Sequence, residues 1–263
     1  MGALLARLQA TPQALWLDSH AYCARLLAGG SAPWLDVGNC VGWQRKAQGL
    51  LKADVLALPV ADIIDAWLAA HPNLRTDMAA KARATYPLRT LLADEALRAH
   101  LVELVLGLRA GLAGLPLVLV LPAPRAWVLM AYAQAHGTAT EAGEDEADSA
   151  SVYIADFLRV FGEAGVEALL LQAAEDAAGC QSLLNVAAHY RWDVGVQGAS
   201  SAPPAGTAFV IAAQALQGLT TGIALDQAFW NGEAANPQGA FVYAHIPVAA
   251  QPEAVLDRLA TLR

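Results

Sequence analysis

Two titratable side chains follow apolar stretches that have the length of a β-strand. His245 comes directly after the stretch 240–244, and Asp62 lies a few residues past the stretch 54–58. Histidine titrates near neutral pH, so His245 suits a general acid or a group that orients a substrate carboxylate. A carboxylate such as Asp62 stabilises positive charge in a transition state. The structural alternatives are a helix N-cap for Asp62 and a hydrogen-bonded rim histidine for His245.

Other side chains are candidates for binding a substrate. Arg125 follows the apolar stretch 116–121 and a Pro-Ala-Pro segment, which makes it the candidate anion anchor, with a surface cap as the alternative. Tyr132 is a candidate for lining an aromatic pocket together with Trp34, Trp43 and Trp230. Large aromatic side chains belong more often to the core, which is the alternative for all four.

The elements that must position these side chains alternate between strand and helix. Residues 94–113 carry one apolar stripe at helical spacing, and residues 151–164 form another predicted helix that Gly165 ends. The predicted strands are apolar without clean alternation, as expected of strands buried on both faces. They span residues 34–37, 54–58, 116–121, 166–171, 192–197, 207–211, 221–225 and 240–244.

Eight strands interleaved with helices predict a parallel (β/α)8 TIM barrel. An open doubly wound sheet is the alternative, because the connections after the fifth to seventh strands are short. Residues 2–30 have the pattern of two helices, interrupted near Thr11 and Pro12 and ended by Gly29 and Gly30. We therefore expect a single barrel domain over residues 1–263, with residues 1–30 as a helical N-terminal extension.

Composition limits the class of protein. Apolar residues make up 56% of the 263 residues and charged residues 15%, which is enough for one large core. The net charge of −8 argues against a nucleic acid or an anionic membrane as partner. The apolar stretches are too short to span a bilayer. Three widely separated cysteines and the absence of a signal-peptide pattern favour a cytoplasmic protein.

Metal binding is not predicted. His20 and Cys23 share a helix face, but they precede the predicted barrel and have no evident third ligand, so packing is the expected role of this pair. Residues 138–149 hold five carboxylates and are expected to form a solvated loop, with a cation-binding lid as the alternative. We expect no cofactor.

Four stretches together resemble the uroporphyrinogen decarboxylase superfamily, whose barrels include cobalamin-independent methionine synthase. These stretches span residues 54–64, 115–132, 157–172 and 244–253, and their order and spacing are similar to those of the family. The resemblance implies that Asp62 steadies a developing cation, that a carboxylate such as Glu175, with Asp176 beside it, faces the substrate, and that the protein forms a homodimer. Placement in the first turn of a helix is the alternative for Glu175 and Asp176.

The chain departs from the family in its cationic residues. Where the family has an arginine-rich segment that grips substrate carboxylates, residues 36–45 contain a single arginine, Arg45. Charge-assisted pairing is what a substrate with many carboxylates needs. We therefore expect a cofactor-free decarboxylase that acts on a small carboxylated compound other than uroporphyrinogen. The alternatives are a methyltransferase and a non-catalytic barrel that binds a small molecule or a partner chain.

Overall fold

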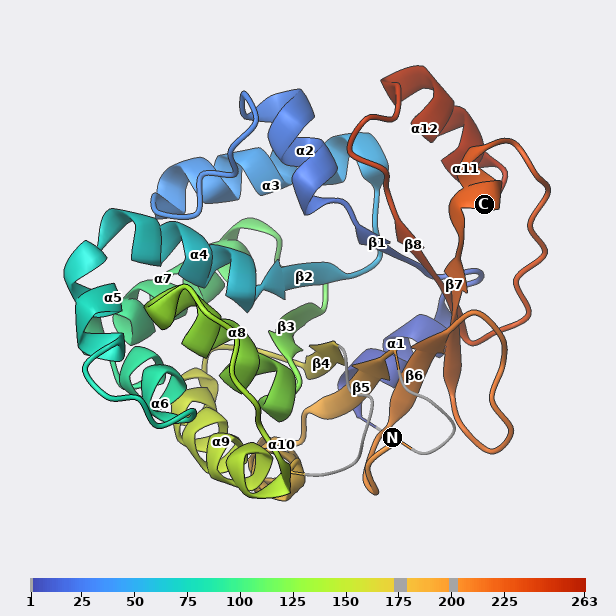
Figure 1. The fold of residues 1–263 in the computed structure, drawn as a ribbon. Coiled ribbons are helices and arrows are strands. Elements are labelled where there is room, and N and C mark those ends of the chain that lie inside the picture. Colours follow the sequence, from blue (N-terminus) through green and yellow to red (C-terminus); the bar gives the residue numbers. More distant parts are fainter. Residues whose placement is uncertain (1, 173–178, 199–202) are drawn as a thin grey trace.

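The computed structural model describes residues 2–172, 179–198 and 203–263. Within them, eight parallel strands form a nearly closed (β/α)8 barrel, in the order β1-β8-β7-β6-β5-β4-β3-β2 (Figure 1). The fold prediction is confirmed. The strands are β1 (Leu15–Asp18), β2 (Leu56–Pro59), β3 (Leu117–Pro122), β4 (Ala168–Gln172), β5 (Asp193–Gln197), β6 (Phe209–Ala212), β7 (Thr221–Leu225) and β8 (Phe241–His245).

Helices follow most of the strands and cover the outside of the barrel. They are α1 (Ala3–Ala10), α2 (His20–Leu27), α3 (Val37–Leu51), α4 (Val60–Ala70), α5 (Pro72–Met78), α6 (Tyr86–Leu92), α7 (Glu95–Gly111), α8 (Pro124–His136), α9 (Glu144–Leu158), the 3-10 turn η1 (Arg159–Phe161), α10 (Gln181–Tyr190), α11 (Gln227–Trp230) and α12 (Pro252–Ala260). Strands β6 and β7 are joined by residues 213–220 without a helix.

Two expectations about the N-terminal third are wrong. Residues 34–36 lie in a loop, Val37 begins α3, and the first strand is Leu15–Asp18, inside the region predicted to be helical. Helices α1 and α2 are present in this region as predicted, but β1 lies between them, so this part of the chain belongs to the barrel itself. A four-residue strand buried on both faces has no alternation that would distinguish it from a helix turn.

The acidic run also differs from its prediction. Residues 138–143 are loop, but Glu144 begins α9, so the later carboxylates lie on the first turns of a helix. Negative charge is favourable there because the helix dipole is positive at its N-terminus. The cation-binding lid has no support, since the described residues hold no metal-binding group of three His, Cys, Asp or Glu side chains.

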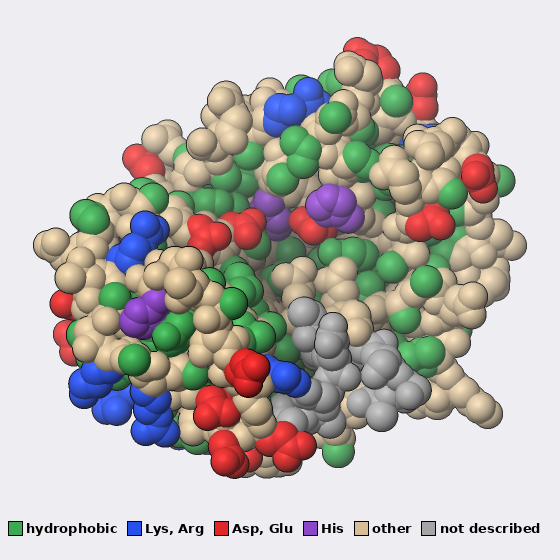
Figure 2. Space-filling model, in the orientation of Figure 1, with side chains coloured by type: hydrophobic (Ala, Val, Ile, Leu, Met, Phe, Trp, Pro, Cys, Tyr) green, Lys and Arg blue, Asp and Glu red, His purple; other side chains and the backbone are tan. Residues whose placement is uncertain are grey.

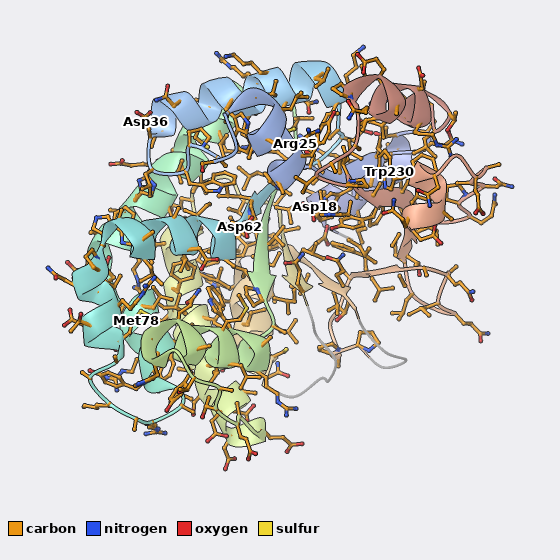
Figure 3. All side chains as sticks on the ribbon, turned by 45° about the horizontal axis from the view of Figure 1, so that its top comes forward. Asp18, Arg25, Asp36, Asp62, Met78 and Trp230 are labelled. Carbon is orange, nitrogen blue, oxygen red and sulfur yellow. The ribbon has the colours of Figure 1, made fainter. Side chains whose placement is uncertain are left out.

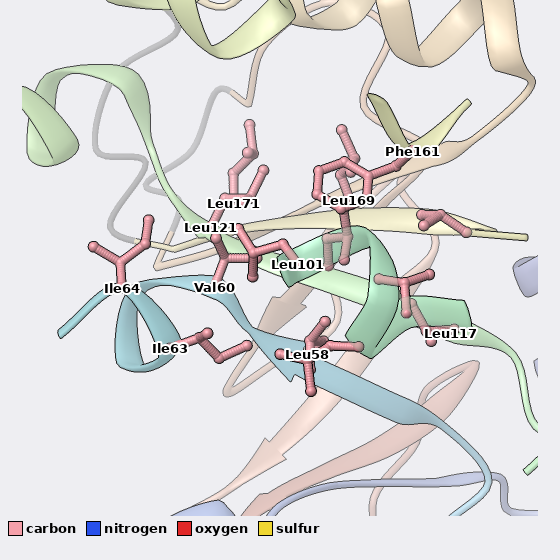
Figure 4. Packing of buried hydrophobic residues seen from close by; sticks show 14 of the residues in the cluster. Leu58, Val60, Ile63, Ile64, Leu101, Leu117, Leu121, Phe161, Leu169 and Leu171 are labelled. Carbon is pink, nitrogen blue, oxygen red and sulfur yellow. The ribbon is translucent and has the colours of Figure 1, made fainter. Parts of the chain in front are cut away.

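Two layers of apolar side chains hold the barrel together. The outer layer lies between strands and helices, where Leu58, Leu121 and Leu169 contact residues of α4 and α7 (Figure 4). The inner layer includes Trp16, Phe209 and Phe241, whose ring centroids are 5.7–5.9 Å apart.

Helix α1 closes the N-terminal end of the barrel. Its Leu4, Leu5 and Leu8 belong to the inner apolar cluster. The buried carboxylate of Asp193, at the start of β5, accepts hydrogen bonds from the backbone N–H groups of Gly2 at 3.0 Å and Leu5 at 3.1 Å. These bonds satisfy N–H groups that a helix start leaves without partners. The opposite, carboxyl end of the barrel remains for a functional site. No helix of the described residues is long and apolar enough to cross a membrane.

Candidate functional site

The last residues of β1 and β8 meet at the carboxyl end of the barrel. The two strands pair in register, with Asp18 opposite His245. The Asp18 carboxylate accepts a hydrogen bond from Nδ1 of His245 at 2.9 Å, since an ionised carboxylate can only accept. The side chain of His245 is 58% exposed and that of Asp18 is 34% exposed, so the pair lies at the rim.

A second histidine contacts the same carboxylate from the start of α2. Nδ1 of His20 lies 3.8 Å from Oδ1 of Asp18, and its Nε2 lies 3.0 Å from the backbone oxygen of Ala57. The imidazole packs against the rings of Trp34 and Trp43, with centroids 5.6 and 6.2 Å away. These contacts hold His20 in one orientation behind Asp18.

A cavity of about 100 Å³ opens between these groups and α4. Asp62, in the first turn of α4, faces it, and Asp18 and Asp62 lie near each other in Figure 3. The N-cap of α4 is Pro59, so the interpretation of Asp62 as the cap is wrong. The lining residues are Trp16, Asp18, His20, Ala57, Pro59, Asp62, Val120, Leu170, Gln172 and Tyr243. Figure 2 shows histidine and acidic side chains gathered around a hollow on this face.

Asp18 and His245 shift each other's pKa. Burial alone would raise the pKa of Asp18, but its contacts with His20 and His245 hold that pKa well below its usual value. The hydrogen bond to Asp18 raises the pKa of His245, although partial burial acts against this. The pair therefore favours a carboxylate next to an imidazolium, which is an arrangement for holding a proton at the rim.

Asp62 and Tyr243 are shifted toward their neutral forms. Burial raises the pKa of Asp62; His20 lowers it, while Asp18 and Asp65 raise it further. Burial, followed by the charge of Asp18, raises the pKa of the Tyr243 hydroxyl, which lies 3.5 Å from Asp18. Near them, Gln172 donates a hydrogen bond to Gln197 at 3.1 Å. The cavity thus holds one firmly ionised carboxylate beside two groups, Asp62 and Tyr243, whose charged forms are disfavoured by burial.

Of the predicted site residues that the structure describes, Asp62 lines the cavity, His245 contacts its lining through Asp18, and Arg125 and Tyr132 do not line it. Arg125 is exposed in the first turn of α8, just beyond β3. The ring of Tyr132 packs against that of His136 of the same helix in a tilted arrangement, with centroids 4.3 Å apart. Glu175, with its neighbour Asp176, lies outside the described residues. The indole rings of Trp34 and Trp43 make an edge-to-face pair in the core, behind His20.

Asp18 and His20 are candidate site residues that sequence reasoning missed. The signal was present, because the segment Leu15–Asp18 is a short apolar run that ends in a polar residue, as β4 and β8 do. Because this segment was predicted to be helical, Asp18 and His20 were not expected at the end of a barrel strand. Packing was the expected role of Cys23, and it is buried, whereas its helix neighbour His20 lines the cavity.

Comparisons with known proteins were made by sequence and by structure. No protein-family model and no curated protein sequence matches the chain. Among solved structures, pyruvate carboxylase of Rhizobium etli, determined with its allosteric activator acetyl coenzyme A, is similar at 12% sequence identity with a TM-score of 0.36. The match covers 72% of this chain and 14% of that one, and a likeness of this degree carries no argument.

Proposed function

We propose that the protein is an enzyme that performs acid–base chemistry on a small molecule, and that its reaction is decarboxylation. The observation that carries the proposal is that Asp18 and Asp62 line one cavity at the carboxyl end of the barrel, where His245 is hydrogen-bonded to Asp18 at the rim. Enzymes with this fold keep their active sites at that end. The likeness of four stretches to the uroporphyrinogen decarboxylase superfamily supports the choice of lyase chemistry.

The proposed reaction begins with proton transfer to an electron-rich carbon of the substrate. Because Nδ1 of His245 is engaged with Asp18, Nε2 is the nitrogen that donates this proton. The substrate ring becomes a cation, and the carboxylates of Asp18 and Asp62 stabilise its charge. The bond to the carboxyl carbon then breaks, its electron pair neutralises the cation, and carbon dioxide leaves. Because the ring itself accepts the electron pair, these steps consume no oxidant and need no cofactor.

The departing carboxylate needs a position away from the two aspartates. The N-terminus of α4 carries Asp62, whereas helix α8 begins directly after β3 and its N-terminus lies at the same end of the barrel. Helix N-termini attract anions through free N–H groups and the helix dipole. Arg125, in the first turn of α8, adds a guanidinium on this side. We assign the substrate carboxylate to this side of the cavity mouth.

A carboxyl-labelled substrate panel tests the proposal. Small heteroaromatic carboxylates, beginning with pyrrole-2-carboxylate, are incubated with the protein in D2O, and labelled carbon dioxide and deuterium in the product are followed by NMR. We expect one deuterium at the carbon that lost the carboxyl group. His245→Gln and Asp62→Asn should each lower the rate about 100-fold or more, as expected for loss of a general acid or a charge-stabilising group.

The matched control is Asp65→Asn, one turn along α4 and outside the lining of the cavity. It removes the same charge from the same helix and should keep most of the rate. Turnover that survives both His245→Gln and Asp62→Asn would show that the site is wrong. Binding of panel compounds without release of carbon dioxide would favour a non-catalytic barrel.

A further inference from the structure

Two hollows on the outside of the barrel adjoin along helix α9. The first, of about 330 Å³, lies between α6, α7 and α9, and its lining includes Arg89, Arg98, Val152, Tyr153, Asp156 and Arg159. The second, of about 410 Å³, lies beside α10, and its lining includes Arg159, Val186 and Tyr190. Arg159 follows the last residue of α9 and borders both hollows, which together form the α9 groove.

Positive charge dominates the first hollow. Its described lining contains the three arginines and one carboxylate, Asp156, in a protein whose net charge is −8. Figure 2 shows lysine and arginine side chains gathered at the lower left, over α6. The α9 groove is therefore a positive region on a negative protein, and a region of this kind attracts an acidic ligand.

The three arginines differ in how far they are already engaged. Arg98 donates from Nε to a backbone carbonyl at the end of α6 at 2.6 Å and from Nη2 to Asp156 at 2.7 Å, which fixes its guanidinium. Nη1 of Arg159 lies 3.7 Å from the other oxygen of Asp156. Arg89 forms no hydrogen bond or ion pair among the described residues, and its guanidinium lies over the ring of Tyr153, 6.0 Å from the centroid. Asp156 thus neutralises one positive charge, and two remain for a ligand.

Apolar and aromatic side chains lie between the charges. Val152 is 54% exposed and shares one face of the helix with Asp156 and Arg159, because these positions are four and three residues apart. Tyr153 lines the first hollow and Tyr190 the second. Arginine and tyrosine are enriched at protein–protein interfaces, whereas lysine is depleted there and is absent from the described lining of the groove. Small-molecule sites enclose most of their ligand, so an open groove of this composition favours a segment of a protein chain.

We infer that the α9 groove docks an acidic segment of another protein, with carboxylates toward Arg89 and Arg159 and an apolar side chain on Val152. The inference does not depend on the proposed reaction, because neither hollow shares a lining residue with the cavity at the carboxyl end of the barrel. Two other occupants are separated from this one by experiment. They are a small phosphate-bearing anion and a second copy of this chain, whose α9 begins with three acidic residues.

A labelled acidic peptide tests the inference. The probe is a helical peptide of about 14 residues with glutamate and leucine at helical spacing, and its matched control carries glutamine in place of glutamate. Fluorescence anisotropy measures the affinity of both peptides for the purified protein. We expect the acidic peptide to bind about tenfold more tightly than the glutamine peptide at about 0.05 M salt. Most of this difference should disappear at about 0.5 M salt, because salt screens exposed charges.

Four substitutions locate the binding in the groove. Arg89→Gln and Arg159→Gln should each weaken the binding of the acidic peptide about three- to fivefold, as expected for the loss of one exposed ion pair. Asp156→Asn should strengthen the binding by a similar factor, because Arg98 and Arg159 lose the carboxylate that now pairs with them. The control is Arg75→Gln, which removes an exposed arginine of α5 outside the lining and should change the affinity less than about twofold. Melting temperatures check that each variant is folded.

Three results would overturn the inference. The first is equal affinity for the acidic and the glutamine peptide, or wild-type affinity in both Arg89→Gln and Arg159→Gln. The second is tighter binding of tripolyphosphate than of the acidic peptide, weakened by Arg159→Gln, which would assign the groove to a small phosphate-bearing anion. The third is a wild-type dimer in sedimentation velocity that Arg159→Gln dissociates, which would assign the groove to a second copy. A monomer that binds the acidic peptide through Arg89 and Arg159 supports the inference.

Discussion

Asp18 and Asp62 line one cavity, yet the protein shifts their pKa values in opposite directions. Asp62 contacts no described hydrogen-bond donor, so burial and the neighbouring acids Asp18 and Asp65 raise its pKa despite the opposing charge of His20. Asp18 has two histidines against it, and their hydrogen bonds and charge overcome burial. At neutral pH the ionised Asp18 therefore stabilises the folded protein, whereas ionisation of Asp62 destabilises it. Substituting each residue tests which of the two has a structural role.

Asp18→Asn should destabilise the protein at pH 7 by about 1 kcal/mol, or roughly 2–4 °C in melting temperature, because water screens a partly exposed pair. The depressed pKa of Asp18 gives stability above its unfolded pKa, near 3.9, and this is lost as the pH falls through the folded value. The difference in stability between the wild type and Asp18→Asn should therefore become smaller below about pH 4. Thermal melts from neutral to acidic pH measure this difference. A difference that stays the same in acid would contradict the pairing of Asp18 with His20 and His245.

Asp62→Asn should leave the melting temperature at pH 7 unchanged or raise it. A carboxyl with a raised pKa in the folded state loses stability once the pH exceeds its unfolded pKa, and the amide removes that loss. The same melts test this variant. Clear destabilisation would show that Asp62 makes a structural contact and is not held for a ligand.

His245 should impose a descending limb on the pH profile of turnover. As a general acid it acts only when protonated, and Asp18 raises its pKa, so the limb should lie above the ordinary histidine value near 6.5. Asp18→Asn should move the limb to lower pH, while Asp65→Asn should leave it in place. If the descending limb does not move in Asp18→Asn, His245 is not the general acid of the reaction.

At the scale of elements, the barrel strands leave room for large aromatic side chains by placing glycine beside them. A Cβ atom on Gly195 of β5 would lie 2.1 Å from the ring of Phe209, and one on Gly222 of β7 would lie 2.2 Å from the ring of Phe241. Both phenylalanines are fully enclosed in the inner layer. A glycine on one strand therefore leaves the space that the phenylalanine ring of the neighbouring strand fills.

Gly195→Ala and Gly222→Ala should each lower the stability by about 1–3 kcal/mol, since the rings have no free space into which they could move. Gly49→Ala is the control, because Gly49 lies within α3 and a Cβ atom there meets nothing within 4 Å. That substitution should stabilise the protein by up to about 1 kcal/mol through helix propensity. Urea unfolding compares the three, and equal stabilities would refute the packing of the inner layer.

The strands also show which elements can be predicted from local pattern. Seven predicted strands overlap β2 to β8, because each is an apolar run between helical segments or turns. The exception is β1, whose four residues lie between two helices and carry no periodicity of their own. Its position follows from pairing with β8, which is a contact across 227 residues of sequence.

At the scale of the whole molecule, the barrel closes at a weak seam between β1 and β2. Asp54 serves both strands there, because its backbone N–H donates to the Leu15 carbonyl at 2.8 Å and its carboxylate accepts from the Leu15 N–H at 2.7 Å. The side chain thus replaces a bond that a regular ladder would form between backbones. Both Asp18 and Asp62 lie beyond this seam, so it positions the site.

Asp54→Ala should open the seam and destabilise the protein by about 1–3 kcal/mol, as expected when a buried N–H loses its acceptor. Hydrogen exchange should accelerate most in β1 and β2 and least in β4 and β5. The control is Asp226→Ala, which removes a cap from the short helix α11 and should leave exchange in β1 unchanged. Uniform acceleration over all strands would mean that the seam does not open by itself.

The sequence by itself determined the class of fold and the end of the barrel at which two candidate site residues lie. Strands buried on both faces must be apolar throughout, and this requirement marks them locally whatever their neighbours are. Parallel strands then bring their carboxyl ends together, which is why His245 and Asp62 could be assigned to one end of the barrel. Only the tertiary structure decided which groups these two residues meet. Asp18 and His20 reach the cavity because closure brings β1 beside β8, and such long-range pairing leaves no trace in the local pattern of either segment.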